Sequence, residues 1–414
     1  MGGVKVFEFK VGISSQEHDA FVSQHPQVSL LQSSSWAKIK DNWGNERLGF
    51  YKNGELVAVA SILIKKLPLG YTMMYIPRGP IMDYQDKDLV TFVMRSLKQF
   101  GASRRSVFIK FDPSLILKQY PIDNSSKEFS ENSTSIEAIQ NLKDANCQWS
   151  GRTIAMSETI QPRYQANRIL KDGLDSDFPK HTKRLMKDAV KRGVITYRGS
   201  LLDISNFETI IALTERRKNV SLRNQEYFQK LMETYGEDAY LHLAKINIPE
   251  RLMEYREQLN KIKKDLSETD EYQKKRLTKL QQQEKSVEKY IIEFQELVQR
   301  YPEEVVIAGV LSVSFGDTLE MLYAGMDDRF KKFYPQYVLY PKVFEDAFND
   351  GKKWANMGGI EGTLDDGLTD FKSNFSPVVQ EYVGEFTLPV NFLYRLVNYF
   401  YHLRKTLRKK QHRK

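Results

Sequence analysis

The chain has 414 residues, the length of two or three domains, and its 41% hydrophobic and 12% aromatic content suits a substantial core. Its formal net charge is +9, and residues 404–414 hold seven basic and no acidic side chains, so the remainder is nearly balanced. One cysteine, Cys147, excludes a disulfide framework and a cysteine-rich zinc site, and the lack of a signal peptide or a membrane-length apolar run leads us to expect a cytoplasmic protein.

Residues 1–150 alternate short apolar runs with helical patterns. These patterns predict strands at 48–51 and 56–63, an amphipathic helix at 87–99 and a buried strand at 106–111. Asn53-Gly54 lies between the first two strands and is a strong hairpin signal. Further upstream, Lys40 follows Trp36 by four residues, the spacing of one helical face.

Asp112 ends the last of these strands and precedes Pro113. The ordinary interpretation is a turn initiator, because Asp-Pro often begins a turn. The functional interpretation is a carboxylate held at the end of a strand, where binding loops gather over a rigid sheet. A lysine amine has a pKa of about 10.4 in model peptides. A nearby carboxylate could orient such an amine or accept its proton before it attacks an ester.

A second unit of similar pattern starts near Gly151. It predicts helices at 178–192, 207–217, 224–235 and 341–348, and a strand pair at 305–314 and 318–324. Gly193 suits the position after the first of these helices. Because no glycine-rich strand-to-helix turn occurs, we do not expect a Rossmann fold. We expect an α/β (α+β) protein with two related units.

Four side chains of the second unit are candidates for binding or catalysis. Arg223 and Tyr227 lie four residues apart and can share a helical face. Tyr323 ends a predicted strand, and Lys372 lies between two phenylalanines. The ordinary interpretation of the arginine and the lysine is a solvated surface. The functional interpretation is a diphosphate clamp for Arg223 and, for Lys372, a cation that neutralises phosphate or stabilises an oxyanion.

The clearest periodic pattern interrupts this second unit. Apolar residues recur at steps of mostly three and four, at Leu252, Tyr255, Leu259, Ile262, Leu266, Leu277, Leu280, Val287, Ile291, Phe294, Val298 and Tyr301. This is the pattern of a coiled-coil seam, and the polar residues 267–271 divide it into two runs. We expect an antiparallel helical hairpin that projects from the second unit; one continuous helix is the alternative.

Several kinds of chemistry have no motif in the sequence. A phosphate-binding Gly-x-x-x-x-Gly-Lys-Ser/Thr loop, a His-Glu-x-x-His pair and a Gly-x-Ser-x-Gly elbow are absent. The Arg/Gln-x-x-Gly-x-Gly/Ala loop of acetyl-CoA-dependent acyltransferases is also missing. We therefore expect neither a metal nor a cofactor. If the protein transfers an acyl group, the donor is already activated by something other than coenzyme A.

Three stretches, in this order, resemble the FemX/FemAB/MurMN family. They are Tyr75-Ile76-Pro77-Arg78-Gly79-Pro80, Phe108–Pro113, and the run from Gly358-Gly359-Ile360 through Gly367-Leu368 and Phe371-Lys372 to Gly384-Glu385-Phe386. The resemblance covers nearly the whole chain. One departure is Asn356, which stands where the family often has an aspartate.

The resemblance implies two GNAT-like acyltransferase domains with an antiparallel coiled-coil arm inserted in the second. Residues 1–150 with about 385–414 would form the first domain, and 151–246 with 306–384 the second. The arm would comprise residues 247–305.

The resemblance also implies a reaction. The family moves an amino acid from aminoacyl-tRNA to the stem-peptide lysine, or to an earlier branch residue, of lipid II or its UDP-linked precursor, UDP-MurNAc-pentapeptide. By analogy, Lys40 and Arg223 would hold the acceptor phosphates, with Tyr227 and Tyr323 lining the acceptor site. Asp112 and Lys372 would lie near the reacting centre.

Other functions stay open. The chain could be a different N-acyltransferase of the same fold, or a non-enzymatic adaptor that binds RNA or membranes. The basic tail at 404–414 can contact phosphates of nucleic acid or anionic lipid, or it is a disordered solubilising end. Leu393, Leu396, Phe400, Leu403 and Leu407 form an apolar stripe that suits either a membrane surface or packing onto the first domain. Peripheral attachment to the inner face of the plasma membrane is the corresponding expectation.

Overall fold

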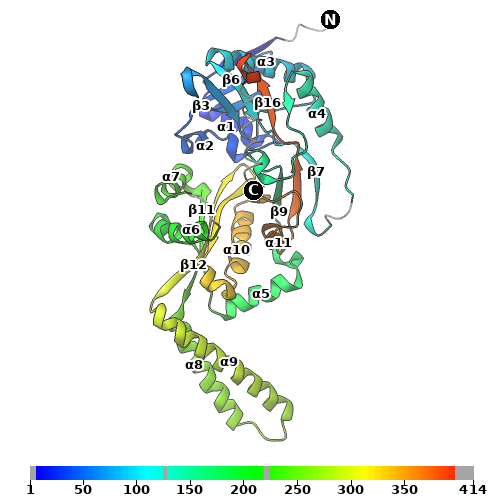
Figure 1. Ribbon diagram of the computed structural model, residues 1–414. Helices are drawn as coiled ribbons and strands as arrows, with labels where there is room; N and C mark the ends of the chain where they lie inside the picture. Colours follow the sequence, from blue (N-terminus) through cyan, green and yellow to red (C-terminus); the bar gives the residue numbers. More distant parts are fainter. Residues whose placement is uncertain (1–5, 125–127, 219–222, 397–414) are drawn as a thin grey trace, which may run out of the picture.

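The computed structural model describes residues 6–124, 128–218 and 223–396. Figure 1 shows an elongated molecule in which one sheet unit lies above a second, and a pair of long helices extends below them. The basic tail and most of the apolar stripe before it lie outside the described residues.

The first unit is built on a sheet of eight strands. Its strands, in spatial order, are β1 (Phe7–Val11), β2 (Gly44–Lys52), β3 (Glu55–Lys66), β4 (Thr72–Ile76), β6 (Ser106–Phe111), β16 (Phe386–Pro389) and β8 (Gln148–Trp149), with β5 (Ile81–Met82) paired to β3. All neighbours are antiparallel except β4 and β6. Helices α3 (Lys87–Ser103) and α4 (Ser133–Asp144) contribute to its core. The predicted hairpin is confirmed, because Asn53 and Gly54, with φ angles of 54° and 86°, connect β2 to β3.

The second unit has a sheet of the same size, also with one parallel pair. Its order is β10 (Ile195–Gly199), β11 (Ala239–Asn247), β12 (Glu304–Phe315), β13 (Thr318–Met326), β14 (Trp354–Gly359), β9 (Tyr164–Ile169), β15 (Val378–Tyr382) and β7 (Ile116–Pro121). The parallel pair is β13 and β14. β7 comes from the range predicted for the first domain but pairs with β15 in this sheet, so the two units share chain segments. The predicted domain limits stay a prediction.

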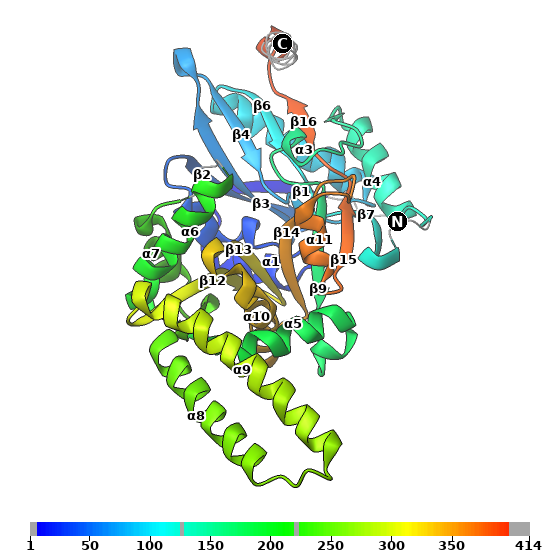
Figure 2. The same ribbon diagram turned by 60° about the horizontal axis from the view of Figure 1, so that its bottom comes forward.

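Alternation along the strands gives the second sheet two distinct faces. Leu241, Leu243 and Val313 pack on one side against α6 (Ile204–Lys218) and α7 (Gln225–Tyr235). Tyr240 and Ala244 lie on the other side with the helices α5 (Lys180–Lys191), α10 (Gln336–Asn349) and α11 (Gly367–Ser373). We call these the inner and the outer face, because the inner face is the one that meets the first unit. Figure 2 shows the helices of the outer face above the arm.

The N-terminal helices join the two units. α1 (Ser15–Gln24) is followed by a short 3-10 helix at Leu30–Gln32 and by α2 (Ser34–Ile39). Leu30, Trp36 and Ile39 of this segment are buried in one cluster with Phe207 and Phe228 of the second unit. This hydrophobic cluster therefore holds the two units against each other.

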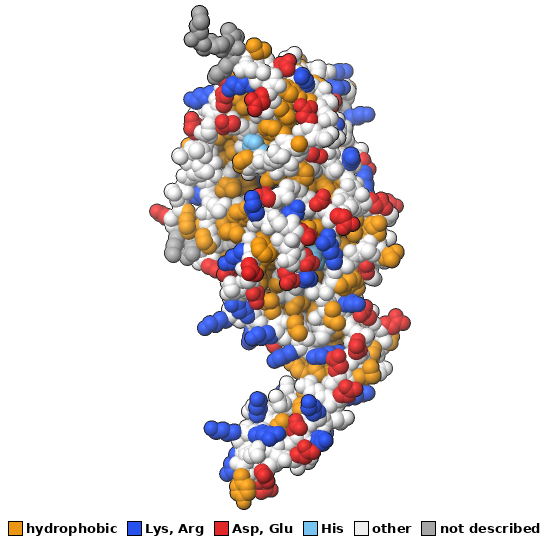
Figure 3. Space-filling model, turned by 180° about the vertical axis from the view of Figure 1, so that it is seen from behind, with side chains coloured by type: hydrophobic (Ala, Val, Ile, Leu, Met, Phe, Trp, Pro, Cys, Tyr) orange, Lys and Arg blue, Asp and Glu red, His pale blue; other side chains and the backbone are white. Residues whose placement is uncertain are grey.

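The inserted arm consists of two helices, α8 (Ile248–Ser267) and α9 (Lys274–Arg300). The expected hairpin is present, and the single continuous helix is excluded. The arm connects β11 to β12 at the end of their ladder, where Asn247 pairs with Glu304. Its apolar seam is buried at Leu252, Tyr255, Ile262, Val287 and Phe294. Figure 3 shows basic and acidic side chains mixed over its surface.

Phe294 anchors the base of the arm, so we predict that Phe294→Ala destabilises the second unit by about 3–5 kcal/mol. Its ring is fully buried, 5.2 Å from the ring of Tyr255 and 5.7 Å from that of Phe333. The control is Ile292→Ala, at a site that is 60% exposed, with an expected change within about 0.5 kcal/mol. Denaturant unfolding measures both, and equal effects would contradict the packing described.

Candidate active site

Four predicted site residues meet where α2 of the first unit faces α7 of the second. The Tyr323 hydroxyl donates to the Tyr227 hydroxyl at 3.2 Å. The Arg223 guanidinium carbon lies 5.1 Å from the Tyr227 ring centroid, and the Lys40 ammonium lies 5.8 Å from the same ring. Lys40 also lies 4.6 Å from the ring centroid of Trp36. We call Lys40, Arg223, Tyr227 and Tyr323 the cation–phenol cluster.

The cation–phenol cluster carries uncompensated positive charge. Among the described residues, neither Lys40 nor Arg223 forms a salt bridge. Burial, and secondly the nearby Arg223, lowers the pKa of Lys40 to about 8. Two cations and the Tyr227 hydroxyl, whose hydrogen is not used in the bond from Tyr323, suit an anion such as a diphosphate.

A β-bulge places Tyr323 on the inner face of the second sheet. Leu311 pairs with Tyr323 and Ser312 with Met321, so Leu322 is the extra residue. Beyond the bulge Val313, an inner-face residue, pairs with Glu320. Residues opposite each other share a face, and Tyr323 and Glu320 therefore both face inward although they are three positions apart, which a regular strand would not allow.

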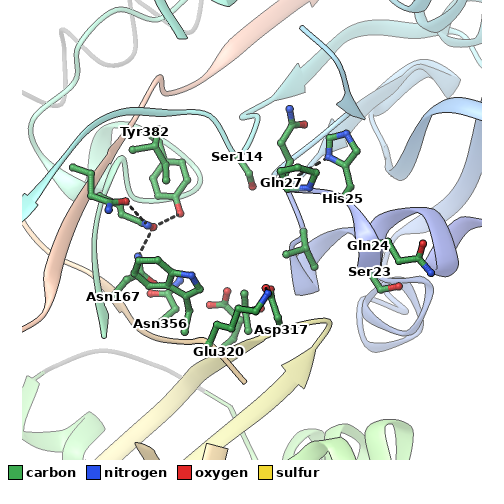
Figure 4. Close-up of a pocket in the computed structure, with 18 residues that line it drawn as sticks. Ser23, Gln24, His25, Gln27, Ser114, Asn167, Asp317, Glu320, Asn356 and Tyr382 are labelled. Carbon is green, nitrogen blue, oxygen red and sulfur yellow. Dashed lines mark hydrogen bonds and ion pairs between the residues drawn. The ribbon is translucent and has the colours of Figure 1, made fainter. Parts of the chain in front are cut away.

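A cavity of about 410 Å³ lies beside Glu320, between the two units. The end of α1 and the segment after it form one wall with Ser23–Val28, and residues of β13, β14, β9, β15 and β7 form another. Figure 4 shows Glu320 and Asp317 between Asn167 and Tyr382 on one side and His25 and Gln27 on the other. The cavity is polar, because most inner-face side chains that reach it are amides, hydroxyls or carboxylates.

The lining of this cavity holds two acids, Asp317, which pairs with Lys353, and Glu320. Burial raises the pKa of Glu320 to about 7, while Arg78 and a hydrogen bond with Asn356 act in the opposite direction. Arg78 lies behind the wall, with its guanidinium 4.4 Å from the Tyr382 ring and donating to the Pro162 carbonyl at 2.9 Å. We did not single out Glu320 from the sequence. The available signal was one acid between Leu319 and Met321 within a predicted strand.

Asp112 lies at the end of β6, close to this cavity but not in its lining. It is 2% exposed, and its carboxylate accepts from the Arg78 backbone N–H at 2.7 Å and from the Tyr75 hydroxyl at 3.0 Å. Burial raises the pKa of Asp112 to about 6. Its contacts hold the loop that carries Arg78, and Ser114, two residues on, reaches the cavity.

Lys372 belongs to α11, and its side chain reaches the last residue of β14. It is 4% exposed, and its ammonium donates to the Gly359 carbonyl at 2.8 Å. Between the Asp112 and Lys372 regions, the Arg78 guanidinium donates to the Pro162 carbonyl, and Pro162 packs closely against Gly359. Neither Asp112 nor Lys372 belongs to the lining of the cavity beside Glu320.

A groove of about 420 Å³ lies on the outer face, next to α11. Its lining includes Lys331, Lys332, Tyr334, Tyr337 and Phe371, which we call the lysine–tyrosine groove. The Tyr337 ring lies 6.2 Å from that of Tyr334 and 6.3 Å from that of Phe371. Both lysines are exposed and, within the described part of the chain, form no salt bridge. Phe371 precedes Lys372, so the groove adjoins the helix of that lysine.

The described residues hold neither a cluster of metal-binding side chains nor a helix that could cross a membrane. No group of three or more His, Cys, Asp or Glu side chains there is arranged to hold a metal ion. Nor does any described helix combine the length and apolarity needed to cross a bilayer.

The two mixed sheets, each with one parallel strand pair, and the inserted helical arm agree with the fold that the family resemblance implied, two GNAT-like units with an arm in the second. A model of the FemAB family matches residues 13–402, and the chain belongs to that family.

Relatives of known function and structure agree with this assignment. The chain is 27% identical over 413 residues to the lipid II:glycine glycyltransferases of Staphylococcus aureus strains MSSA476 and MW2, covering 94% of each protein. A crystal structure of FemX matches with a TM-score of 0.79 and 26% identity, covering 94% of this chain and 99% of that one.

The lowered pKa of Lys40 predicts a pH-dependent anion site. Lysine is cationic below its pKa, so affinity for a diphosphate should fall roughly tenfold from about pH 7 to about pH 9. The affinity can be measured by calorimetry with UDP-N-acetylglucosamine, whose diphosphate does not titrate in this pH range. Lys40→Arg should remove the pH dependence, because arginine stays charged. The control, Lys38→Ala at an exposed site near the end of α2, should leave the pH dependence of binding as in wild type. Equal pH dependence in Lys40→Arg would contradict this role.

Proposed function

We propose that this protein transfers an amino acid from aminoacyl-tRNA to the stem-peptide lysine, or to a preceding branch residue, of lipid II or its UDP-linked precursor. The observation that carries the proposal is the cation–phenol cluster beside a polar cavity on one face of the second sheet. A diphosphate-linked peptide would need both features. The names of the relatives, lipid II:glycine glycyltransferase, make glycine the first donor to test.

The predicted site residues take separate roles in this proposal. Lys40 and Arg223 hold the diphosphate, and the Tyr227 hydroxyl donates to it, while Tyr323 lines the site and donates to Tyr227. Lys372 places positive charge at the end of β14, where it stabilises the negative charge that develops on the ester oxygen. Asp112 acts as a positioning residue, because both of its carboxylate oxygens already accept hydrogen bonds from the Arg78 loop and Tyr75.

The lysine–tyrosine groove supports an RNA-borne donor. Exposed aromatic rings beside lysines suit a single strand, since bases stack on the rings while lysines approach the phosphates. Helix α5 extends this surface, because the His181 ring lies 6.5 Å from that of Tyr337. Lys180, Arg184 and Lys187 of the same helix are exposed. A tRNA 3′ end in the groove would bring its ester towards Lys372.

Attachment to the inner membrane surface is a further part of the proposal. A lipid-linked acceptor places the reaction at an anionic surface, to which the basic residues 404–414 would be attracted. The alternatives, another N-acyltransferase and a non-enzymatic adaptor, lack a specific observation in their favour.

A transfer assay tests the proposed function. Purified protein is mixed with lysine-containing lipid II and with tRNA charged with radiolabelled glycine, alanine or serine. We expect label from one donor to enter the lipid fraction and to require Lys372, so that Lys372→Ala loses about 100-fold or more in rate. Folded wild-type protein that transfers no label to unbranched or branched acceptor would contradict the proposal.

The groove gives a separate prediction for the donor. The double variant Lys331→Ala, Lys332→Ala should raise KM for charged tRNA roughly tenfold at low salt, because two phosphate contacts are lost. Binding of the UDP-linked acceptor should not change. The control is Arg95→Ala, Lys98→Ala, the same loss of charge on the exposed side of α3. If both double variants raised KM equally, the effect would come from the overall positive charge of the protein and not from contacts in the groove.

A further inference from the structure

The cavity around Glu320 differs in charge from the cation–phenol cluster. Lys353 is the lysine in its lining, and it is paired with Asp317 at 3.2 Å. Arg78 is directed to the Pro162 carbonyl and lies against Tyr382. Among the described residues Glu320 forms no salt bridge. A half-buried carboxylate in a polar cavity is stabilised by a cationic guest more than by a neutral or anionic one.

We propose that this cavity holds the primary ammonium group of the acceptor peptide, with the Glu320 carboxylate as its hydrogen-bond acceptor and then as the acceptor of its proton. This inference rests on the proposed function and adds to it a residue that touches the reacting nitrogen.

The walls of the cavity are prepared for a peptide. Asn167 donates to Gln380 at 2.7 Å, and Gln380 in turn donates to Gln119 at 3.0 Å. Asn356 donates to Gln165 at 2.8 Å, and its own side-chain oxygen accepts from the Gly358 N–H at 2.8 Å. These bonds fix the orientation of each amide before a ligand arrives. Fixed amides with remaining donors and acceptors suit the backbone of a peptide, whose polar groups are themselves amides.

The acceptor, rather than the donor, fits this cavity. Glu320 and Tyr323 share the inner face of β13, so one molecule with a diphosphate and an amine can contact both. The lysine–tyrosine groove is instead associated with the outer-face core, which includes Tyr334 and Phe371. Donor and acceptor would then approach the second sheet from opposite faces.

The donor and the acceptor can meet where the parallel pairing of β13 and β14 ends. β13 and β14 pair over three residues, and Glu320 with Asn356 is the last pair. Two residues further, Gly358 has a φ of 84°, and the next residue, Gly359, accepts from Lys372. Glu320 and Lys372 are thus connected through one short stretch of β14.

The proposed reaction removes two protons from the acceptor nitrogen. The ammonium gives one proton to Glu320, and the neutral nitrogen forms a bond to the ester carbonyl carbon. The bond from that carbon to the ribose oxygen breaks, and a second proton from the nitrogen passes to the ribose oxygen. The nitrogen keeps one hydrogen in the new amide, and Glu320 releases its proton to solvent. No other reactant is needed.

Binding of two acceptors tests the inference without a donor. The probes are lysine-containing UDP-MurNAc-pentapeptide and the same compound with an acetylated lysine amine. Wild type should prefer the free amine by at least about tenfold, because the lost contact is a charged hydrogen bond. Glu320→Gln, which has the same shape without the charge, should bind both probes equally. Glu320→Asp should keep part of the preference.

The control is Glu304→Gln, at the exposed end of β12, which should keep the full preference. Thermal unfolding verifies that each variant is folded. An undiminished preference in folded Glu320→Gln would overturn the inference. The inference would also be overturned if the only effect of Glu320→Gln in the transfer assay were a changed KM for charged tRNA. If wild type prefers the amine but no donor supports transfer, the proposed function fails while the amine site stands.

Discussion

The site depends on the apolar contact between the N-terminal helices and the inner face of the second sheet. Trp36 and Ile39 bury against Phe207 and Phe228, and Lys40, the residue after α2, is thereby held beside Tyr227. Burying a large apolar side chain contributes about 1.5–3 kcal/mol, and several are buried here. Two like charges about 4 Å apart near a protein surface repel by about 4 kcal/mol. Packing therefore outweighs the repulsion between Lys40 and Arg223 and keeps the anion site open.

The second sheet then organises the chemistry by its two faces. The bulge at Leu322 brings Tyr323 and Glu320 to the same face, which links phosphate binding to the polar cavity in our account. The outer face carries the aromatic rings and lysines of the groove. Between them, the short β13–β14 ladder ends at Glu320 and Asn356. In the proposed function, this arrangement would let the donor and the acceptor reach one point without competing for the same surface.

Much of this arrangement could be predicted from sequence, because it depends on local patterns. The hairpin at Asn53-Gly54 and the two-helix arm follow from turn chemistry and apolar spacing. Lys40, Arg223, Tyr227 and Tyr323 were candidates one by one, but only tertiary packing shows that they adjoin. Glu320 was not identified, because its orientation depends on the bulge two residues later, which no local pattern reveals. Where the family resemblance suggested an acid, the chain has Asn356, and the acid lies opposite it on the neighbouring strand.

The most direct test of the account is a crystal structure of the protein with UDP-MurNAc-pentapeptide bound. We expect the diphosphate between Lys40 and Arg223, and the lysine amine within hydrogen-bond distance of the Glu320 carboxylate, about 3 Å. A diphosphate at the cation–phenol cluster with the amine directed away from the cavity would contradict the amine site. A diphosphate bound elsewhere would contradict the account as a whole.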